Sequence, residues 1–211
     1  MNRVTVDDTP VEVPPGATIL DAATAAGRWV PTVCFDDRQA PFGGCRVCMV
    51  AVEGSPKPLP ACTTPCRDGM AIDTEEPTAR RVSRTVVELV LSELPEPPET
   101  HTELARVAAR LGVSGSRWSG AVHPREDDLR HPYLALRHEL CISCGRCVRA
   151  CDEIQGAFAL TATGRGFEAN IAAGLDAGFE DSTCVSCGAC ADTCPTDAIS
   201  EISLVAQLER S

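Results

Sequence analysis

Two short runs in the C-terminal third of the chain each hold four cysteines in one pattern, Cys-x2-Cys-x2-Cys-x3-Cys. The runs comprise Cys141, Cys144, Cys147 and Cys151, and then Cys184, Cys187, Cys190 and Cys194. Three sulfurs at two-residue gaps require a loop that wraps tightly around one object, whereas the fourth cysteine points elsewhere. The pattern is an internal repeat, for which duplication of a metal-binding loop is the simplest origin.

This pattern is typical of bacterial ferredoxins with two [4Fe-4S] clusters, where the fourth cysteine of each run ligates the other cluster. Crossing the ligands predicts one cluster on Cys141, Cys144, Cys147 and Cys194. It predicts the other on Cys184, Cys187, Cys190 and Cys151. Gly145 and Gly188 lie inside the loops, where we expect the missing Cβ to let backbone N–H groups approach cluster sulfur.

A third group of cysteines lies near the N-terminus and reads Cys34-x10-Cys45-x2-Cys48-x13-Cys62. A long loop followed by a distant last cysteine is the general arrangement of plant-type [2Fe-2S] sites, although their usual spacing begins Cys-x4-Cys-x2-Cys. Twelve cysteines are then assigned and Cys66 remains. A small buried hydrophobic residue is the expected role of that cysteine.

The composition favours metal ligation over other uses of the cysteines. The 211 residues include 13 cysteines, an odd number, and the chain has neither a signal-peptide pattern nor an apolar run of membrane-spanning length. We therefore expect a cytoplasmic protein, where closely spaced cysteines bind metals rather than pair as disulfides. Structural zinc is the alternative, but zinc sites place two Cys-x2-Cys pairs farther apart. The net charge of −11 argues against nucleic acid as a partner.

Local patterns predict an α+β fold with three parts. Residues 1–76 should form a [2Fe-2S] ferredoxin-like domain, with a hairpin at 4–13, a helix from Thr18 to Ala26 and strands at 47–52 and 70–73. Residues 77–135 should be a helical linker, with helices from Pro77 to about Leu94 and from Thr102 to Leu111. The first of these helices either covers its own domain's core or docks a partner. Residues 136–211 should form a two-[4Fe-4S] ferredoxin-like domain.

The cysteine segments resemble one family of iron–sulfur proteins. The quoted segments are PTVCFDDRQAPFGGCRVCMVAVEG, PACTTPCRDGM, CISCGRCVRACDEIQGAFALTATGRGFEA and CVSCGACADTCPTDAI. They resemble the N-terminal region of the complex I large iron–sulfur subunit, the diaphorase small subunit of NAD-reducing [NiFe] hydrogenases, and the catalytic subunit of NAD-dependent formate dehydrogenases. The resemblance implies a β-grasp [2Fe-2S] domain, a bacterial-type two-[4Fe-4S] domain, and a genuine [2Fe-2S] site on Cys34, Cys45, Cys48 and Cys62.

One departure from the family removes a cluster. Family members carry a further [4Fe-4S] site on a His-x3-Cys-x2-Cys-x5-Cys motif, but reading it from His101 places Ala105, Ala108 and Ser114 at the cysteine positions. We therefore expect no cluster in the linker. His101, His123, His131 and His138 are all interpreted as loop or surface residues.

The resemblance implies an electron-transfer subunit without catalytic residues of its own. Such a subunit would link a flavin-containing NAD(P)-binding diaphorase subunit, docked on residues 1–76, to a catalytic subunit docked on the C-terminal repeat. The run from Gly156 to Ala169 looks most like the formate dehydrogenase branch, with hydrogenase as the alternative. Two other hypotheses are a freely diffusing multi-cluster ferredoxin and a zinc-stabilised interaction protein.

Overall fold

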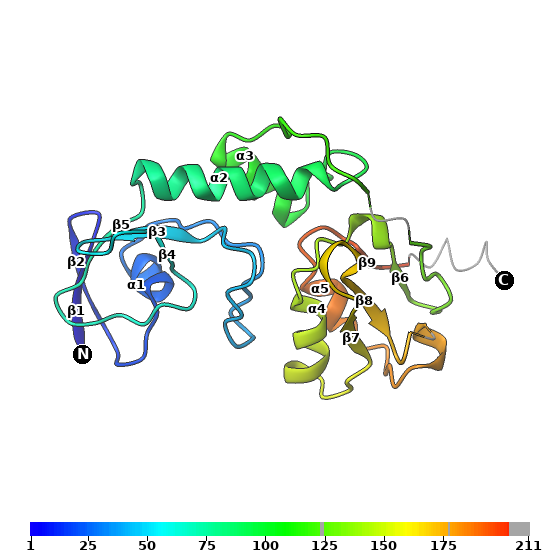
Figure 1. The fold of residues 1–211 in the computed structure, drawn as a ribbon. Helices are drawn as coiled ribbons and strands as arrows, with labels where there is room; N and C mark the ends of the chain where they lie inside the picture. The colour runs from blue at the N-terminus through cyan, green and yellow to red at the C-terminus, as the bar shows by residue number, and fades with distance from the viewer. Residues whose placement is uncertain (123–124, 177, 203–211) are drawn as a thin grey trace. The chain divides into compact units, whose positions relative to one another are not determined.

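The computed structural model describes residues 1–122, 125–176 and 178–202, and it divides into two compact units. Unit one comprises residues 1–35, 41–89 and 107–114, and unit two comprises residues 36–40, 90–106 and 115–211. The five-residue segment 36–40, which follows Cys34, therefore belongs to unit two. Figure 1 shows the elements of each unit.

Unit one is built on a five-stranded mixed sheet with the strand order β2-β1-β5-β3-β4. Its strands are β1 (Asn2–Val6), β2 (Thr9–Val13), β3 (Met49–Val52), β4 (Leu59–Pro60) and β5 (Ala71–Asp73). β1 and β2 form the predicted antiparallel hairpin, in which Val4 pairs with Val11. Asp7 and Asp8 both have positive φ in the two-residue turn, as a hairpin turn compatible with strand twist requires. β1 and β5 run parallel, whereas the other pairs are antiparallel.

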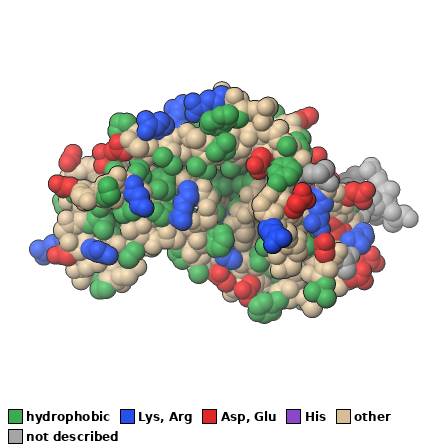
Figure 2. Space-filling model, in the orientation of Figure 1, with side chains coloured by type: hydrophobic (Ala, Val, Ile, Leu, Met, Phe, Trp, Pro, Cys, Tyr) green, Lys and Arg blue, Asp and Glu red, His purple; other side chains and the backbone are tan. Residues whose placement is uncertain are grey.

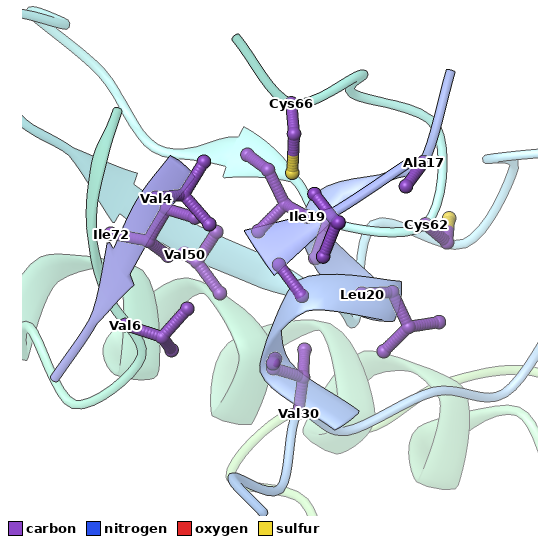
Figure 3. Packing of buried hydrophobic residues seen from close by; sticks show 14 of the residues in the cluster. Val4, Val6, Ala17, Ile19, Leu20, Val30, Val50, Cys62, Cys66 and Ile72 are labelled. Carbon is purple, nitrogen blue, oxygen red and sulfur yellow. The ribbon is translucent and has the colours of Figure 1, made fainter. Parts of the chain in front are cut away.

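Helix α1 (Ile19–Ala25) supplies the other side of this core. Thr18 is its N-cap and forms a capping box with Asp21, and Gly27 follows the C-cap residue Ala26 with φ of 68°, so both ends are as predicted. Figure 3 shows Ile19 directed toward Val4, Val50 and Ile72 of the sheet. Leu20 belongs to the same buried cluster. The apolar side chains of the predicted strands and helix therefore meet in one cluster.

Helices α2 (Pro77–Ser92) and α3 (Glu103–Leu111) follow the bounds expected from the sequence. The buried positions of α2 are Ala79, Ser83 and Val87, which recur every fourth residue and form one face. Val82 and Val86 are only half-buried and Leu89 is 47% exposed, so the apolar residues that define the helical period are not its buried face. Figure 2 shows Lys and Arg side chains gathered on the face in view over α2 and α3.

Unit two consists of short elements arranged around the cysteine loops. Its strands are β6 (Leu134–Leu136), β7 (Leu160–Thr163), β8 (Asn170–Ala173) and β9 (Ile199–Glu201), and they form two antiparallel pairs, β6-β9 and β7-β8. Its helical turns are η1 (His138–Leu140), α4 (Arg146–Arg149), η2 (Ala150–Ile154), η3 (Gly166–Glu168), η4 (Phe179–Asp181) and α5 (Ala189–Asp192). Cys147, Cys151 and Cys190 belong to its hydrophobic core. Some of the predicted cluster ligands are thus also part of the hydrophobic core.

The α+β class expected from the sequence is confirmed, with sheets and helices in both units. None of the helices in the described ranges is long and apolar enough to cross a membrane.

Candidate metal centres

The first cysteine group lies in unit one. Cys34, Cys48 and Cys62 are buried to 2% exposure or less, and Cys45 is half-buried. The Sγ atoms of Cys48 and Cys62 are 3.3 Å apart, and the backbone N–H of Cys45 donates to Cys34 Sγ at 3.5 Å. Cys34 therefore lies beside Cys45, and Cys48 lies beside Cys62.

The surroundings of these thiols raise the pKa of two of them. A hydrogen bond to Cys34 and burial raise the pKa of Cys45 far above its ordinary value. The bond to Cys62 and burial do the same to the pKa of Cys48. Thiolates are the forms that bind metal, so cluster assembly must release these protons.

Cys66 lies apart from that set, as a small core residue. It is 4% exposed within the cluster around Ile19, and its Sγ donates to the backbone oxygen of Thr18 at 3.2 Å. Burial raises its pKa, which disfavours the reactive thiolate. The expected burial of this cysteine is confirmed.

In unit two, Cys141, Cys144, Cys147 and Cys194 line one small pocket. Its other walls are mostly apolar and include Leu136, Ile171 and Ile199. Cys151 does not line it. The fourth cysteine beside this space, Cys194, therefore belongs to the second run.

The remaining four cysteines also come together. Cys190 is near enough to Cys184, Cys187 and Cys151 for their charges to raise its pKa, to about 12, although burial is the larger cause. Cys151 Sγ accepts the backbone N–H of Ala159 at 3.2 Å, which orients it. Cys187 is the one exposed member of this set.

The two loops share a backbone conformation as well as a sequence. Gly145 and Gly188 both have positive φ, 73° and 76°, and each is the N-cap of a short helix, α4 or α5. Ser143 and Ser186, two residues earlier, also have positive φ, 51° and 60°. Glycine is thus needed in these loops for its conformation, as well as for any close approach of the backbone. Alternating left-handed residues turn successive N–H groups toward one point, an arrangement that favours an anion such as an iron–sulfur core.

The donor chemistry of these sites fits iron–sulfur clusters. Each set consists of four cysteine sulfurs, the ligands that such clusters use, held by loops with inward N–H groups. Burial raises the pKa of Cys144 to about 12 and that of Cys147 well above its usual value, because each thiolate would be desolvated and close to others. Among the described residues, no three His, Cys, Asp or Glu side chains are close enough to hold a single metal ion.

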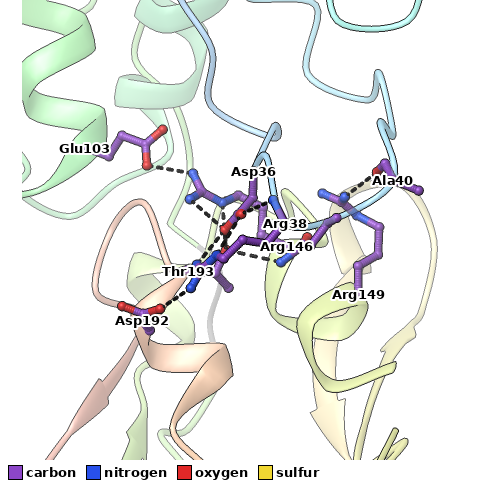
Figure 4. Close-up of polar contacts among 9 residues, drawn as sticks. Asp36, Arg38, Ala40, Glu103, Arg146, Arg149, Asp192 and Thr193 are labelled. Atoms are coloured by element: carbon purple, nitrogen blue, oxygen red, sulfur yellow. Dashed lines mark hydrogen bonds and ion pairs between the residues drawn. The ribbon is translucent and has the colours of Figure 1, made fainter. Parts of the chain in front are cut away.

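A charged network lies beside the pocket-lining cysteines, and Figure 4 shows it. Asp36 accepts from the backbone N–H and guanidinium of Arg38, at 2.9 Å and 2.7 Å, and Arg38 also pairs with Asp192. The Arg38 guanidinium holds the pKa of Asp36 well below its usual range. Residues 36–40 thus reach the turn of α5, immediately before Cys194.

Arg146, between Cys144 and Cys147, is the buried centre of this network. Its side chain is 7% exposed, and it pairs with Glu103 at 2.7 Å and with Asp36 at 3.5 Å. Thr193 accepts from Arg146 Nε at 3.0 Å and donates to Asp36 Oδ2 at 2.6 Å. Its hydroxyl therefore uses both its donor and its acceptor capacity, and the two opposite charges are joined through it. Sequence patterns gave no sign of the role of Asp36, since Arg146 and Thr193 are distant from it in the chain.

Two of the histidines expected in loops or at the surface are buried. His101 is a surface residue as predicted, with its side chain 69% exposed and hydrogen-bonded to Asp197 at 2.6 Å. His131 and His138, however, are buried, at 3% and 5% exposure, and burial lowers the pKa of both. Each ring contacts a residue far along the chain, Phe179 for His131 and Asn170 for His138, so residue spacing could not indicate their burial. His123 lies outside the described residues.

Comparison with protein-family models assigns both cysteine regions. Residues 1–77 match a 2Fe-2S iron-sulfur cluster binding domain, and residues 140–198 match a 4Fe-4S dicluster domain.

Relatives extend the likeness over most of the chain. NADP-reducing hydrogenase subunit HndD of Solidesulfovibrio fructosivorans is 34% identical over 95% of this chain. The mitochondrial NADH dehydrogenase (ubiquinone) iron-sulfur protein 1 of Solanum tuberosum is 34% identical over 78%. The alignments span 36% and 23% of those two proteins, so this chain corresponds to a minor part of each. A chain in the crystal structure of NAD+-reducing [NiFe]-hydrogenase in the H2-reduced state superposes with a TM-score of 0.88 at 29% identity, covering 96% of this chain and 88% of the solved one.

These findings confirm the resemblance drawn from the cysteine segments. The chain is an iron–sulfur protein that joins an N-terminal 2Fe-2S domain to a C-terminal 4Fe-4S dicluster domain, and it resembles the iron–sulfur region of complex I and NAD(P)-linked hydrogenase subunits.

Proposed function

We propose that the chain carries three clusters and relays electrons between two partner subunits. The [2Fe-2S] cluster would be held by Cys34, Cys45, Cys48 and Cys62. One [4Fe-4S] cluster would be held by Cys141, Cys144, Cys147 and Cys194, and the other by Cys184, Cys187, Cys190 and Cys151. When bound, such clusters supply one-electron redox centres.

The observation that carries this proposal is the small, mostly apolar pocket lined by four cysteines from two separate runs. Leu136, Ile171 and Ile199 form apolar walls of this pocket, and low polarity around cluster sulfur is one of the means by which a protein sets a reduction potential. The chain's own residues would therefore hold the cluster and set its surroundings.

The second cysteine set would lie nearest to a docked catalytic subunit. Cys187 is exposed, and so are Val185 at 58% and Phe158 at 69%. The segment of Phe158 is held beside this set, since Thr183 Oγ1 donates to Ala157 O at 2.7 Å and Ala159 N donates to Cys151 Sγ. Exposed apolar side chains around a redox site provide a surface that a partner can cover.

For the partners, we infer a flavin-containing NAD(P)-binding diaphorase subunit on the [2Fe-2S] side and a catalytic subunit on the dicluster side. The Gly156–Ala169 run favours formate dehydrogenase as the catalytic subunit. Hydrogenase is the second candidate, and it is supported by the likeness to the NADP-reducing and NAD+-reducing hydrogenases. A freely diffusing ferredoxin would use the same clusters without fixed partners.

Co-expression decides between these possibilities. The chain is produced with candidate diaphorase and catalytic subunits, and the purified complex is assayed for NAD(P) reduction by formate and, separately, by hydrogen. We expect activity with one donor only, and we expect it to be lost when this chain is omitted. Activity that survives the omission would refute the relay, and failure to co-purify with any partner would favour the diffusing carrier.

A further inference from the structure

His131 is a buried residue whose ring is fixed on three sides. Its ring lies edge-on to Phe179 and Tyr133, with centroid distances of 5.4 Å and 5.9 Å. Its Nδ1 lies 3.0 Å from the backbone nitrogens of both Tyr133 and Leu134. Packing and hydrogen bonds together hold the ring in one orientation.

These contacts assign the tautomer of His131. A backbone N–H can only donate, so Nδ1 must be the acceptor of both bonds and carries no proton. The single proton of the ring is therefore on Nε2, and Nε2 is a donor. It lies 3.7 Å from Cys184 Sγ and 3.2 Å from Ser186 Oγ. Because Nε2–H cannot accept a hydrogen bond, Ser186 Oγ must be the acceptor in this contact. Ser186 Oγ and Cys184 Sγ therefore share the one N–H donor of His131.

We propose that His131 is a positioning residue of the second [4Fe-4S] site, where its Nε2–H donates to Cys184 Sγ and raises the reduction potential of the cluster held there. This inference rests on the proposed ligand role of Cys184. A ligating thiolate is charged and is thus a stronger acceptor than a neutral hydroxyl. A hydrogen bond to ligand sulfur stabilises the reduced state more, because that state carries one more negative charge.

Two substitutions test the roles of the two ring nitrogens separately. In His131→Asn, the side-chain oxygen takes the place of Nδ1 and keeps the acceptor for Tyr133 and Leu134, but nothing reaches Cys184. In His131→Gln, the longer amide places its N–H groups near the position of Nε2 and keeps the donor. Ser186→Ala removes the competing acceptor and leaves the sulfur contact undivided.

The full chain with its clusters is titrated at constant pH, and EPR follows both [4Fe-4S] signals. For His131→Asn, we expect the reduced-to-oxidised ratio of the second cluster to fall about tenfold at a fixed potential, a shift of ~59 mV for one electron. The first cluster should not shift. His131→Gln should retain most of the wild-type ratio, and Ser186→Ala should leave the ratio unchanged or raise it.

An unchanged potential in His131→Asn would overturn the inference. Equal falls in the Asn and Gln variants would also overturn it, since that result would point to the ring's packing rather than to its donor. If wild-type protein shows two [4Fe-4S] signals and neither variant shifts, only this inference fails. If wild-type protein forms no second [4Fe-4S] cluster, the proposed ligand set fails and this inference fails with it.

A second measurement does not depend on the variants' folding. In wild-type protein labelled with [15N]histidine, pulsed EPR of the reduced second cluster should detect a 15N coupling and a coupled exchangeable proton. Absence of both would overturn the proposal even if neither variant assembled its clusters.

Discussion

Asp36 and Arg146 form a buried ion pair across unit two, with Asp36 Oδ2 3.5 Å from the Arg146 guanidinium and Thr193 Oγ1 bonded to both. Asp36 follows the first predicted [2Fe-2S] ligand by two residues, and Arg146 stands between two predicted [4Fe-4S] ligands. Further along the segment, Arg149 donates to Ala40 O at 2.8 Å and Ala40 N donates to Glu153 at 2.7 Å. Both ends of the segment 36–40 thus form hydrogen bonds or ion pairs with other parts of unit two.

Removing the charge of Asp36 should loosen this segment. In Asp36→Asn, buried Arg146 keeps Glu103 but loses its second carboxylate, and such a loss costs about 1–3 kcal/mol. Backbone amides of residues 36–40 should then exchange with solvent roughly 5- to 150-fold faster, as hydrogen-exchange mass spectrometry can measure. The neighbouring Asp37 is exposed, so Asp37→Asn is the matched control and should change little. A similar effect in both variants would contradict the role of the pair.

The same pair predicts a pH dependence with a definite sign. The pKa of Asp36 is held below its usual range, so its stabilising effect is complete above the pKa of an unfolded aspartate, about 3.9, and is lost as pH falls below that value. Asp36→Asn should therefore speed amide hydrogen exchange of residues 36–40 by the same factor at about pH 7 and at about pH 5, once the rates are corrected for the intrinsic effect of pH. A difference that already shrinks at pH 5 would show that the carboxyl titrates at an ordinary pKa.

The crossed ligand sets predict how iron is lost in double variants. With all sites loaded we expect about 10 iron and no zinc per chain, and a lost [4Fe-4S] cluster removes about four. Cys144→Ser combined with Cys194→Ser should leave about 6 iron, because both residues serve one cluster. Cys144→Ser combined with Cys151→Ser should leave about 2, because two clusters are damaged.

Uncrossed ligands would reverse these two values. Cys66→Ser serves as the control in the same anaerobic iron and sulfide analysis. It should retain about 10 iron, because Cys66 lies in the core and bonds to Thr18.

The N-cap of α1 gives a test of stability in unit one. Thr18→Ala removes the acceptor for Asp21 N–H and should destabilise the protein by about 1 kcal/mol. The same substitution at Thr24, which is exposed within the helix, should be neutral or slightly stabilising because alanine has the higher helix propensity. Thermal unfolding under anaerobic conditions compares the two. Equal destabilisation would mean that the cap contributes nothing specific.

What could be predicted from the sequence was local. The hairpin, α1 with its Thr18 cap, and the ends of α2 and α3 follow from residue periodicity and from turn and cap residues within a few positions. The crossed ligand sets of the C-terminal cysteines stay a prediction, which the ferredoxin pattern itself encodes.

What could not be predicted depends on contacts between distant residues. Asp36 meets Arg146 and Thr193, and His131 meets Cys184, only after the chain has folded. His131 stands in a segment without periodicity, so nothing nearby indicated its burial. The buried face of α2 is hard to predict for a different reason: Ala79 and Ser83 on it are small, so an apolar pattern does not mark them.

Charge governs the last prediction, which concerns assembly with partners. The chain has a formal charge of −11. Twelve cysteinates would add about −12, and three oxidised cores at about +2 each would return about +6, so the loaded chain would carry about −17. Partner surfaces rich in arginine and lysine should therefore bind it. Raising the salt from about 50 to about 500 mM should weaken the complex about tenfold or more.

The measurement is reconstitution from separate subunits. Alone, the chain should neither reduce NAD nor oxidise formate or hydrogen, yet a strong chemical reductant should reduce it. Added to the isolated diaphorase and catalytic subunits, it should restore NAD(P) reduction, and the amount required for half-maximal activity should rise with salt because the screened charges attract less. Restoration that is independent of salt would show that apolar contacts dominate the interface. NAD(P) reduction by the two partners alone would show that electrons pass between them without this chain.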